Sequence, residues 1–128
     1  MSKVRELWSS AATREDLRAA KNYLSLLYSD TATKRLTLSL SRTRTTRATA
    51  KDLLRASNLP LLPRDESQVK EDLKRIHKAK ALSPVLLVRG DMSQGVPLLI
   101  AEGSHRICAI CHFDEDAPIA CRIADLRR

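Results

Sequence analysis

The stretch that most constrains the fold lies at residues 98–113, where an apolar run is followed by a glycine and then by apolar residues at helical spacing. Residues 98–101 have the length and composition of a strand, and Gly103 interrupts the run. Ile107, Ile110 and Cys111 then fall on one face of a helix. The order predicts a strand, a glycine turn and a helix, which is an element pair of an α/β domain.

Three polar residues, Ser104, His105 and Arg106, follow this glycine and occupy the first turn of the expected helix. Backbone N–H groups there have no partner within the helix, and the helix dipole is positive. A hydroxyl, an imidazole and a guanidinium at such a position predict a phosphate-binding site. A solvated, capped helix start is the alternative. The carboxylate of Glu102 opposes an anion unless it serves a metal ion or a proton transfer.

Caps and hydrophobic periodicity predict the remaining elements. Further helices are expected over residues 14–28, 31–41, 48–56 and 65–77, with Thr13 and Ser29 or Asp30 as caps of the first two. Residues 31–41 also alternate like a half-buried strand, but the preceding cap favours a helix. Further strands are expected at 83–88, 96–101 and 118–123, and the threonines of 42–47 favour extended structure.

The length of the chain, its apolar runs and its cysteine count limit the classes of protein to which it can belong. The chain has 128 residues, enough for a single domain with one core, and no apolar run is long enough to cross a bilayer. Its first residues lack the apolar segment of a signal peptide. The three cysteines are too few for a secreted disulfide scaffold. We therefore expect a soluble, cytoplasmic protein with no membrane partner.

The formal net charge of +8 favours an acidic partner, such as nucleic acid or a nucleotide. Arg42, Arg44 and Arg47 lie in a segment without any acidic residue between Thr31 and Ala50. No aromatic residues are interleaved there, so the stacking platforms of a single-strand binder are missing. The segment is either a surface that contacts duplex DNA or a solvated basic face.

Cysteine and histidine residues recur along the expected helix after Gly103. His105, Cys108 and Cys111 follow one another at intervals of three, and His112 is adjacent. This spacing is compatible with zinc or with a redox pair. Structural zinc sites usually draw ligands from two elements, however, and Cys121 is the single candidate elsewhere. Packing of the three thiols in the core is the preferred interpretation, and no metal site is expected.

The order of elements from Pro63 and Arg64 to the Glu102-Gly103-Ser104-His105-Arg106 turn resembles the ParB/sulfiredoxin superfamily over about residues 63–124. Sulfiredoxins carry Gly-Cys-His-Arg, and ParB partition proteins carry Gly-Glu-Arg-Arg, where this chain has Gly103 to Arg106. The resemblance implies one α/β domain with a mixed sheet and helices. Residues 1–48 are then an N-terminal helical segment, and residues 49–128 are the ParB/sulfiredoxin-like core.

The same resemblance implies a nucleotide or phosphorylated ligand at the helix start. Its phosphates are expected to contact the four residues of the turn together with a fifth from the Pro-Arg element, namely Gly103, Ser104, His105, Arg106 and Arg64. A nucleoside triphosphate with Mg2+ is the implied cofactor. Some members phosphorylate small hydroxyl compounds, so Glu102 is a candidate general base of a phosphotransferase or nucleotide hydrolase.

Two departures limit the resemblance. Ser104 replaces the cysteine whose thiolate sulfiredoxin chemistry requires, so that activity is rejected. The sequence ends at Arg128, with no length for the helix-turn-helix domain that reads a partition site. The alternative function is a non-enzymatic, DNA-associated module that uses Arg42, Arg44 and Arg47. Neither the nucleobase nor the oligomeric state follows from the sequence.

Overall fold

The computed structural model describes residues 7–126. Its α-helices are α2 (Arg14–Leu24), α3 (Asp30–Arg42), α4 (Ala50–Ser57), α5 (Ser67–His77) and α6 (Ser104–Phe113). Its strands are β1 (Thr46–Thr49), β2 (Val85–Val88), β3 (Leu99–Glu102) and β4 (Pro118–Ala124), and a short 3-10 helix, η1 (Met92–Gln94), lies between β2 and β3. The α/β class expected from the sequence is confirmed.

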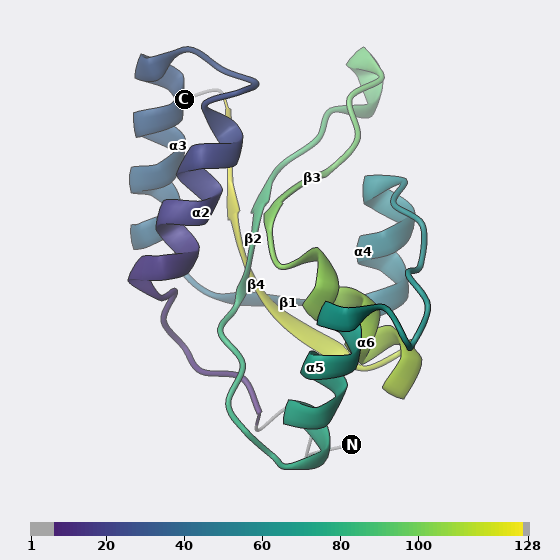
Figure 1. Cartoon of the computed structure of the whole chain (residues 1–128). Helices are drawn as coiled ribbons and strands as arrows, with labels where there is room; N and C mark the ends of the chain where they lie inside the picture. Colours follow the sequence, from purple (N-terminus) through teal and green to yellow (C-terminus); the bar gives the residue numbers. More distant parts are fainter. Residues whose placement is uncertain (1–6, 127–128) are drawn as a thin grey trace.

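The four strands form one mixed sheet in the order β1-β4-β2-β3. The strand β4 pairs antiparallel with β1 and parallel with β2, so that Cys121 lies opposite both Thr46 and Val85. The strands β2 and β3 are antiparallel and are joined by the projecting hairpin that carries η1 (Figure 1). The parallel β2–β4 pair needs a crossover connection, and α6 is part of it.

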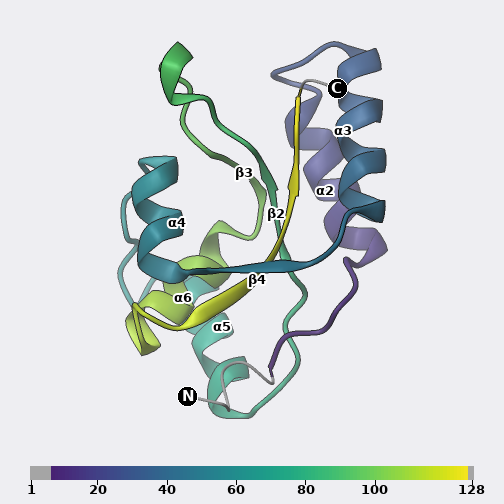
Figure 2. The ribbon, with the colours of Figure 1, turned by 180° about the vertical axis from the view of Figure 1, so that it is seen from behind.

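Helices cover both faces of this sheet. The helices α2 and α3 lie on one face, and α4, α5 and α6 lie on the other, as Figures 1 and 2 show from opposite sides. Side chains of a strand point alternately to the two faces. Accordingly, Val85 and Leu87 belong to the core beneath α6, while Leu86 and Val88 pack against α2 and α3. A strand buried on both faces explains the uninterrupted apolar run of β2.

Local capping explains where the first two helices begin. Thr13 Oγ1 accepts a hydrogen bond from Asp16 N, and Ser29 Oγ accepts one from Ala32 N. The helix after Ser29 is therefore confirmed over the alternative strand. The first helix ends at Leu24 rather than near residue 28, because the chain turns through residues 25–28 to reach the second cap. The helix α5 begins at Ser67, within the expected range, with Glu66 as its cap.

Trp8 joins the segment before α2 to the rest of the fold. Trp8 forms a parallel bridge with Leu82, and its indole N–H donates to Pro118 O at 3.2 Å. This contact directs the chain toward the start of α2, beside β3 and the turn after it. Within residues 7–126 the structure contains no helix that combines the length and the apolarity needed to cross a bilayer.

Candidate functional site

The turn between β3 and α6 depends on a glycine. Gly103 has φ of +111°, a conformation that side-chain-bearing residues rarely adopt. A Cβ atom at this position would lie 2.6 Å from Val85 Cγ1 and 2.7 Å from Arg106 Nη2. Both the backbone angle and the close packing therefore require glycine. The expected strand, glycine turn and helix are confirmed at this point of the chain.

The first turn of α6 leaves backbone donors available. The first hydrogen bond of the helix runs from Ile107 N to Gly103 O at 3.1 Å. Gly103 stands at the N-cap position, and no side chain caps the helix there. The N–H groups of Ser104, His105 and Arg106 consequently have no acceptor within the helix. They carry the positive end of its dipole.

A cavity of about 550 Å³ adjoins this turn, and we call it the turn pocket. Glu102, Gly103, Ser104 and His105 form its polar end. The remaining lining residues are largely apolar and come from α2, the segment before α5, α5 itself and β3: Tyr23, Leu59, Gln68, Ile100 and Ala101. Tyr23 is 42% exposed and Leu59 is 41% exposed, so their side chains are accessible. The turn pocket thus combines the uncapped start of α6 and the Glu102 carboxyl group with a largely apolar wall.

His105 lies close to the carboxylate of Glu66, the residue that caps α5. Its Nε2 is 3.8 Å from Glu66 Oε2, and the other carboxylate oxygen, Oε1, accepts from Val69 N at 2.9 Å. One glutamate therefore caps α5 and at the same time faces the imidazole.

Glu102 is half-buried at the polar end of the turn pocket. Burial raises the pKa of its carboxyl group, and Asp16 raises it further, while Arg106 and His105 act in the opposite direction. A carboxyl group with a raised pKa exchanges protons closer to neutral pH than an exposed one does. Glu102 thus lies beside the turn, half-buried, with a carboxyl group whose pKa is raised.

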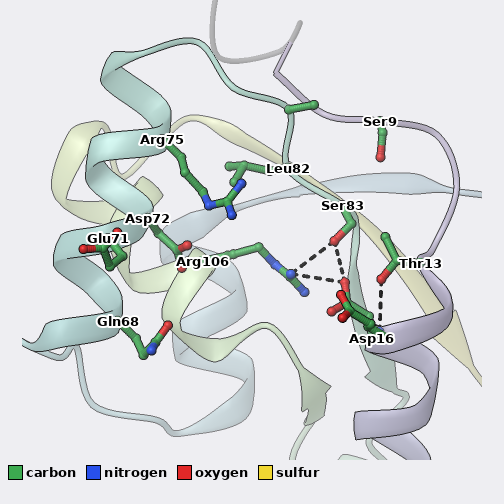
Figure 3. Close-up of a pocket in the computed structure, with 12 residues that line it drawn as sticks. Ser9, Thr13, Asp16, Gln68, Glu71, Asp72, Arg75, Leu82, Ser83 and Arg106 are labelled. Atoms are coloured by element: carbon green, nitrogen blue, oxygen red, sulfur yellow. Dashed lines mark hydrogen bonds and ion pairs between the residues drawn. The ribbon is translucent and has the colours of Figure 1, made fainter.

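The side chain of Arg106 turns away from the turn pocket and enters a second cavity, shown in Figure 3. Its Nη1 donates to Asp16 Oδ2 at 3.2 Å and to Ser83 Oγ at 3.2 Å. Ser83 Oγ donates to the same Asp16 oxygen. We call these three side chains the clasp. Arg106 Nε and Nη2 are buried without a hydrogen-bond partner.

The second cavity, the clasp pocket, has a volume of about 560 Å³. It lies between the start of α2, the face of α5 and the segment before β2 (Figure 3). Glu71, Asp72 and Arg75 line it from α5, and Gln68 borders both pockets. Burial raises the pKa of Asp72, while Arg106 and Arg75 lower it. Charges of both signs therefore face this hollow.

The structure brings some of the expected site residues together and separates others. Gly103, Ser104 and His105 share the turn pocket with Glu102, whereas Arg106 contributes its backbone to the turn and its guanidinium to the clasp pocket. Arg64 is exposed on the segment before α5 and lines neither pocket. Arg42 at the end of α3, Arg44 in the connection after it and Arg47 on β1 are all exposed.

The cysteines pack as expected. Cys108 and Cys121 belong to the core, and Cys111 packs against it. Burial raises the pKa of Cys121 to about 11, well above the range in which a thiol is reactive. In the part of the chain that the structure describes, no group of three or more histidine, cysteine or acidic side chains is arranged to hold a metal ion.

Sequence reasoning missed Asp16, Ser83 and Tyr23. Asp16 falls in the first turn of the helix expected after Thr13, where acidic residues are common. Ser83 precedes a strand, and Tyr23 lies on an amphipathic helix, so neither stands out in the sequence.

Comparisons with protein-family models, with curated proteins and with solved structures find no match for this chain.

Proposed function

We propose that the protein binds a nucleotide or another phosphorylated ligand in the turn pocket, at the start of α6. One observation carries the proposal: Ser104 and His105, whose backbone N–H groups are uncapped at the start of α6, line the polar end of a cavity. Phosphate oxygens accept hydrogen bonds from such groups, and the helix dipole adds attraction. The net charge of +8 attracts the same class of ligand over longer distances.

Side chains of the turn supply further contacts. Ser104 offers a hydroxyl donor, and His105 offers a ring N–H. Gly103 lets the ligand approach the backbone closely because it has no side chain. Arg106 adds positive charge behind the turn, whereas Arg64, a contact that the ParB/sulfiredoxin resemblance implies, does not line the turn pocket.

The apolar wall gives a place for the rest of the ligand. Tyr23, Leu59 and Ile100 line the pocket away from the helix start. An aromatic ring and aliphatic side chains suit a nucleobase or another flat organic group. A nucleotide uses both ends of the pocket, whereas inorganic phosphate uses one.

A catalytic form of the proposal uses Glu102. This carboxylate lies in the same pocket as the proposed phosphate position. With a nucleoside triphosphate and Mg2+ bound, Glu102 would accept the proton of a substrate hydroxyl as that oxygen bonds to the terminal phosphorus and the bond to the leaving nucleoside diphosphate breaks. Glu102→Gln then removes transfer while leaving nucleotide binding within severalfold of wild type.

A thermal-shift screen with CTP, ATP, GTP, ADP and pyrophosphate, with and without Mg2+, tests the binding step. A ligand that binds only the folded state stabilises it by about 2.7 kcal/mol at a hundred times its dissociation constant. The diagnostic variant is Ser104→Asp, which places a carboxylate where the phosphate is proposed. Thr31→Asp is the matched control, because it adds the same charge to the exposed first turn of α3.

The proposal predicts a shift for wild type and for Thr31→Asp, and its loss in Ser104→Asp. Equal shifts in both variants would place the ligand elsewhere. No shift with any ligand in wild-type protein would refute the nucleotide proposal.

Contact with DNA is the second candidate function, and one observation favours it. Arg42, Arg44 and Arg47 are exposed, and none forms a salt bridge with another residue of the described chain. Phosphate contacts by such side chains lose affinity steeply as salt is raised. Duplex binding that falls with salt, weakens in Arg44→Ala and survives in Ser104→Asp would support this surface instead of the turn pocket.

A further inference from the structure

In the clasp, Arg106 and Ser83 form the kind of donor pair that binds an anion, and the anion they bind is the carboxylate of Asp16. A guanidinium and a hydroxyl both donate to one carboxylate oxygen, Asp16 Oδ2. The side chains of Arg106 and Asp16 are 13% and 16% exposed, so the pair is largely removed from water. Removing a guanidinium from water without a paired anion is costly, which explains why an acceptor is present.

Asp16 satisfies this guanidinium incompletely. It engages Nη1 alone, while Nε and Nη2 remain buried without partners. A carboxylate or phosphate that binds arginine well accepts two parallel N–H bonds. The pairing seen here, through Nη1 alone, is therefore weaker than a bidentate one.

The first turn of α2 is the least buried part of that helix. The fully buried residues of α2 are Ala20 and Leu24, both beyond the first turn, while Thr13, Arg14 and Glu15 are exposed. Asp16 can leave Arg106 by a side-chain rotation or by fraying of this turn without unpacking the sheet. The clasp pocket, of about 560 Å³, offers the space for a replacing group, and Arg75 faces it from α5.

We propose that Arg106 and Ser83 form an anion subsite that Asp16 occupies in this structure, and that an anionic group of the ligand displaces Asp16 when it binds. The inference rests on the proposed function and deepens it, because Arg106 joins the turn to the clasp pocket. Asp16 is then a residue that sets ligand affinity by competing with the ligand. Its removal strengthens binding, whereas loss of a purely structural contact does not.

Isothermal titration with inorganic pyrophosphate tests this competition. Asp16→Ala frees Arg106, and we expect its affinity for pyrophosphate to rise about tenfold, the scale of one charge-assisted hydrogen bond. Asp16→Asn keeps the shape and an acceptor oxygen, so a smaller rise is expected; it also serves if Asp16→Ala does not fold. Glu15→Gln is the matched control, because it removes a neighbouring carboxylate that lines the same pocket without touching Arg106.

A double variant tests whether the Arg106 guanidinium causes the rise in affinity for pyrophosphate. In Asp16→Ala combined with Arg106→Gln, the rise disappears if the freed guanidinium causes it. Equal rises in Asp16→Ala and Glu15→Gln would show a general charge effect and overturn the inference. An unchanged or weaker affinity in Asp16→Ala would also overturn it.

The two proposals fail in different ways. If wild type binds pyrophosphate, Ser104→Asp abolishes binding and Asp16→Ala changes nothing, the turn pocket stands and the competition is wrong. If neither wild type nor the Asp16 variants bind pyrophosphate or a nucleotide, both are wrong. Binding seen only after Asp16 is replaced would refute nucleotide binding by the wild-type protein, and it would also refute the competition, because no ligand would then displace Asp16.

Discussion

Arg122 on β4 donates from its Nη1 to Leu40 O, in the last turn of α3, at 3.1 Å. The same atom donates to Ser41 O at 3.0 Å, and Nη2 donates to Ser10 O at 3.0 Å. Nε donates to Thr45 Oγ1 at 3.1 Å. One guanidinium thus satisfies carbonyl groups that the end of a helix leaves without partners and opposes the negative end of its dipole. It also joins β4 to the segment that leads into α2.

Replacement of Arg122 by alanine is therefore expected to destabilise the protein strongly. Loss of this hydrogen-bonded charge lowers the free energy of unfolding by about 2–4 kcal/mol. Urea denaturation measures the effect. Arg89→Ala is the control, because Arg89 forms an exposed ion pair with Asp125, and such pairs contribute about 0–1 kcal/mol. Similar losses in the two variants would show that the Arg122 contacts do not stabilise the fold.

Gly103→Ala tests the turn that begins α6. The new methyl group meets Val85 Cγ1 and Arg106 Nη2, and alanine at φ of +111° is strained. Such a backbone conformation alone costs about 1–3 kcal/mol, and the collision adds to it. Gly95→Ala separates the two effects, because Gly95 has φ of +71° with no atom within 4 Å of the added carbon.

We expect Gly103→Ala to unfold at clearly lower urea concentration than Gly95→Ala. Its clasp is also expected to be displaced, which amide hydrogen exchange in the first turn of α2 detects. Equal midpoints for the two variants would mean that the packing around Gly103 yields to a methyl group.

The features that the sequence predicted correctly are those with local causes. A cap and its helix lie within four residues of each other, so Thr13 and Ser29 predict where α2 and α3 begin. The glycine turn is equally local, because Gly103 must bear an unusual φ wherever the chain enters α6. The apolar run of β2 predicts burial on both faces.

The features that the sequence could not predict join distant residues. Arg106 and Asp16 are 90 positions apart, and Arg122 meets Ser10 across 112 positions. No local pattern pairs a particular arginine with a particular carboxylate over such distances. For this reason the sequence placed the Arg106 guanidinium with Ser104 and His105, whereas the structure turns it into the clasp pocket.

Ala79 offers a stabilising substitution. It has φ of +55° just after α5, where Ala79 N donates to Ile76 O and Lys80 N donates to Arg75 O. This pattern ends helices in the left-handed conformation that glycine adopts without strain. Ala79→Gly is expected to raise the free energy of unfolding by about 0.5–1 kcal/mol, less the extra entropy of the unfolded chain.

Asn58→Gly is the comparison for this prediction. Asn58 ends α4 with φ of +60°, and asparagine tolerates that region better than alanine does. We therefore expect a smaller gain at residue 58 than at residue 79, measured by thermal and urea unfolding. A loss of stability in Ala79→Gly would show that backbone strain at residue 79 is negligible.

Glu102 makes stability depend on pH in a defined direction. Burial raises the pKa of its carboxyl group above the ordinary value of 4.5, so the folded protein holds this proton more tightly than the unfolded chain does. Where the folded state binds more protons, stability falls as pH rises. The contribution of Glu102 is thus most favourable below pH 4.5 and is lost as pH rises through the folded-state value.

Glu102→Gln removes this titration, since an amide stays neutral. Relative to wild type, the variant is expected to become progressively more stable as pH rises from about 4 to 7, as measured by urea midpoints across that range. Glu115→Gln, on an exposed turn, is the control and should show no comparable trend. A constant difference between Glu102→Gln and wild type would mean that burial does not disfavour the ionised carboxylate, and Glu102 would then lose its suitability as a proton acceptor near neutral pH.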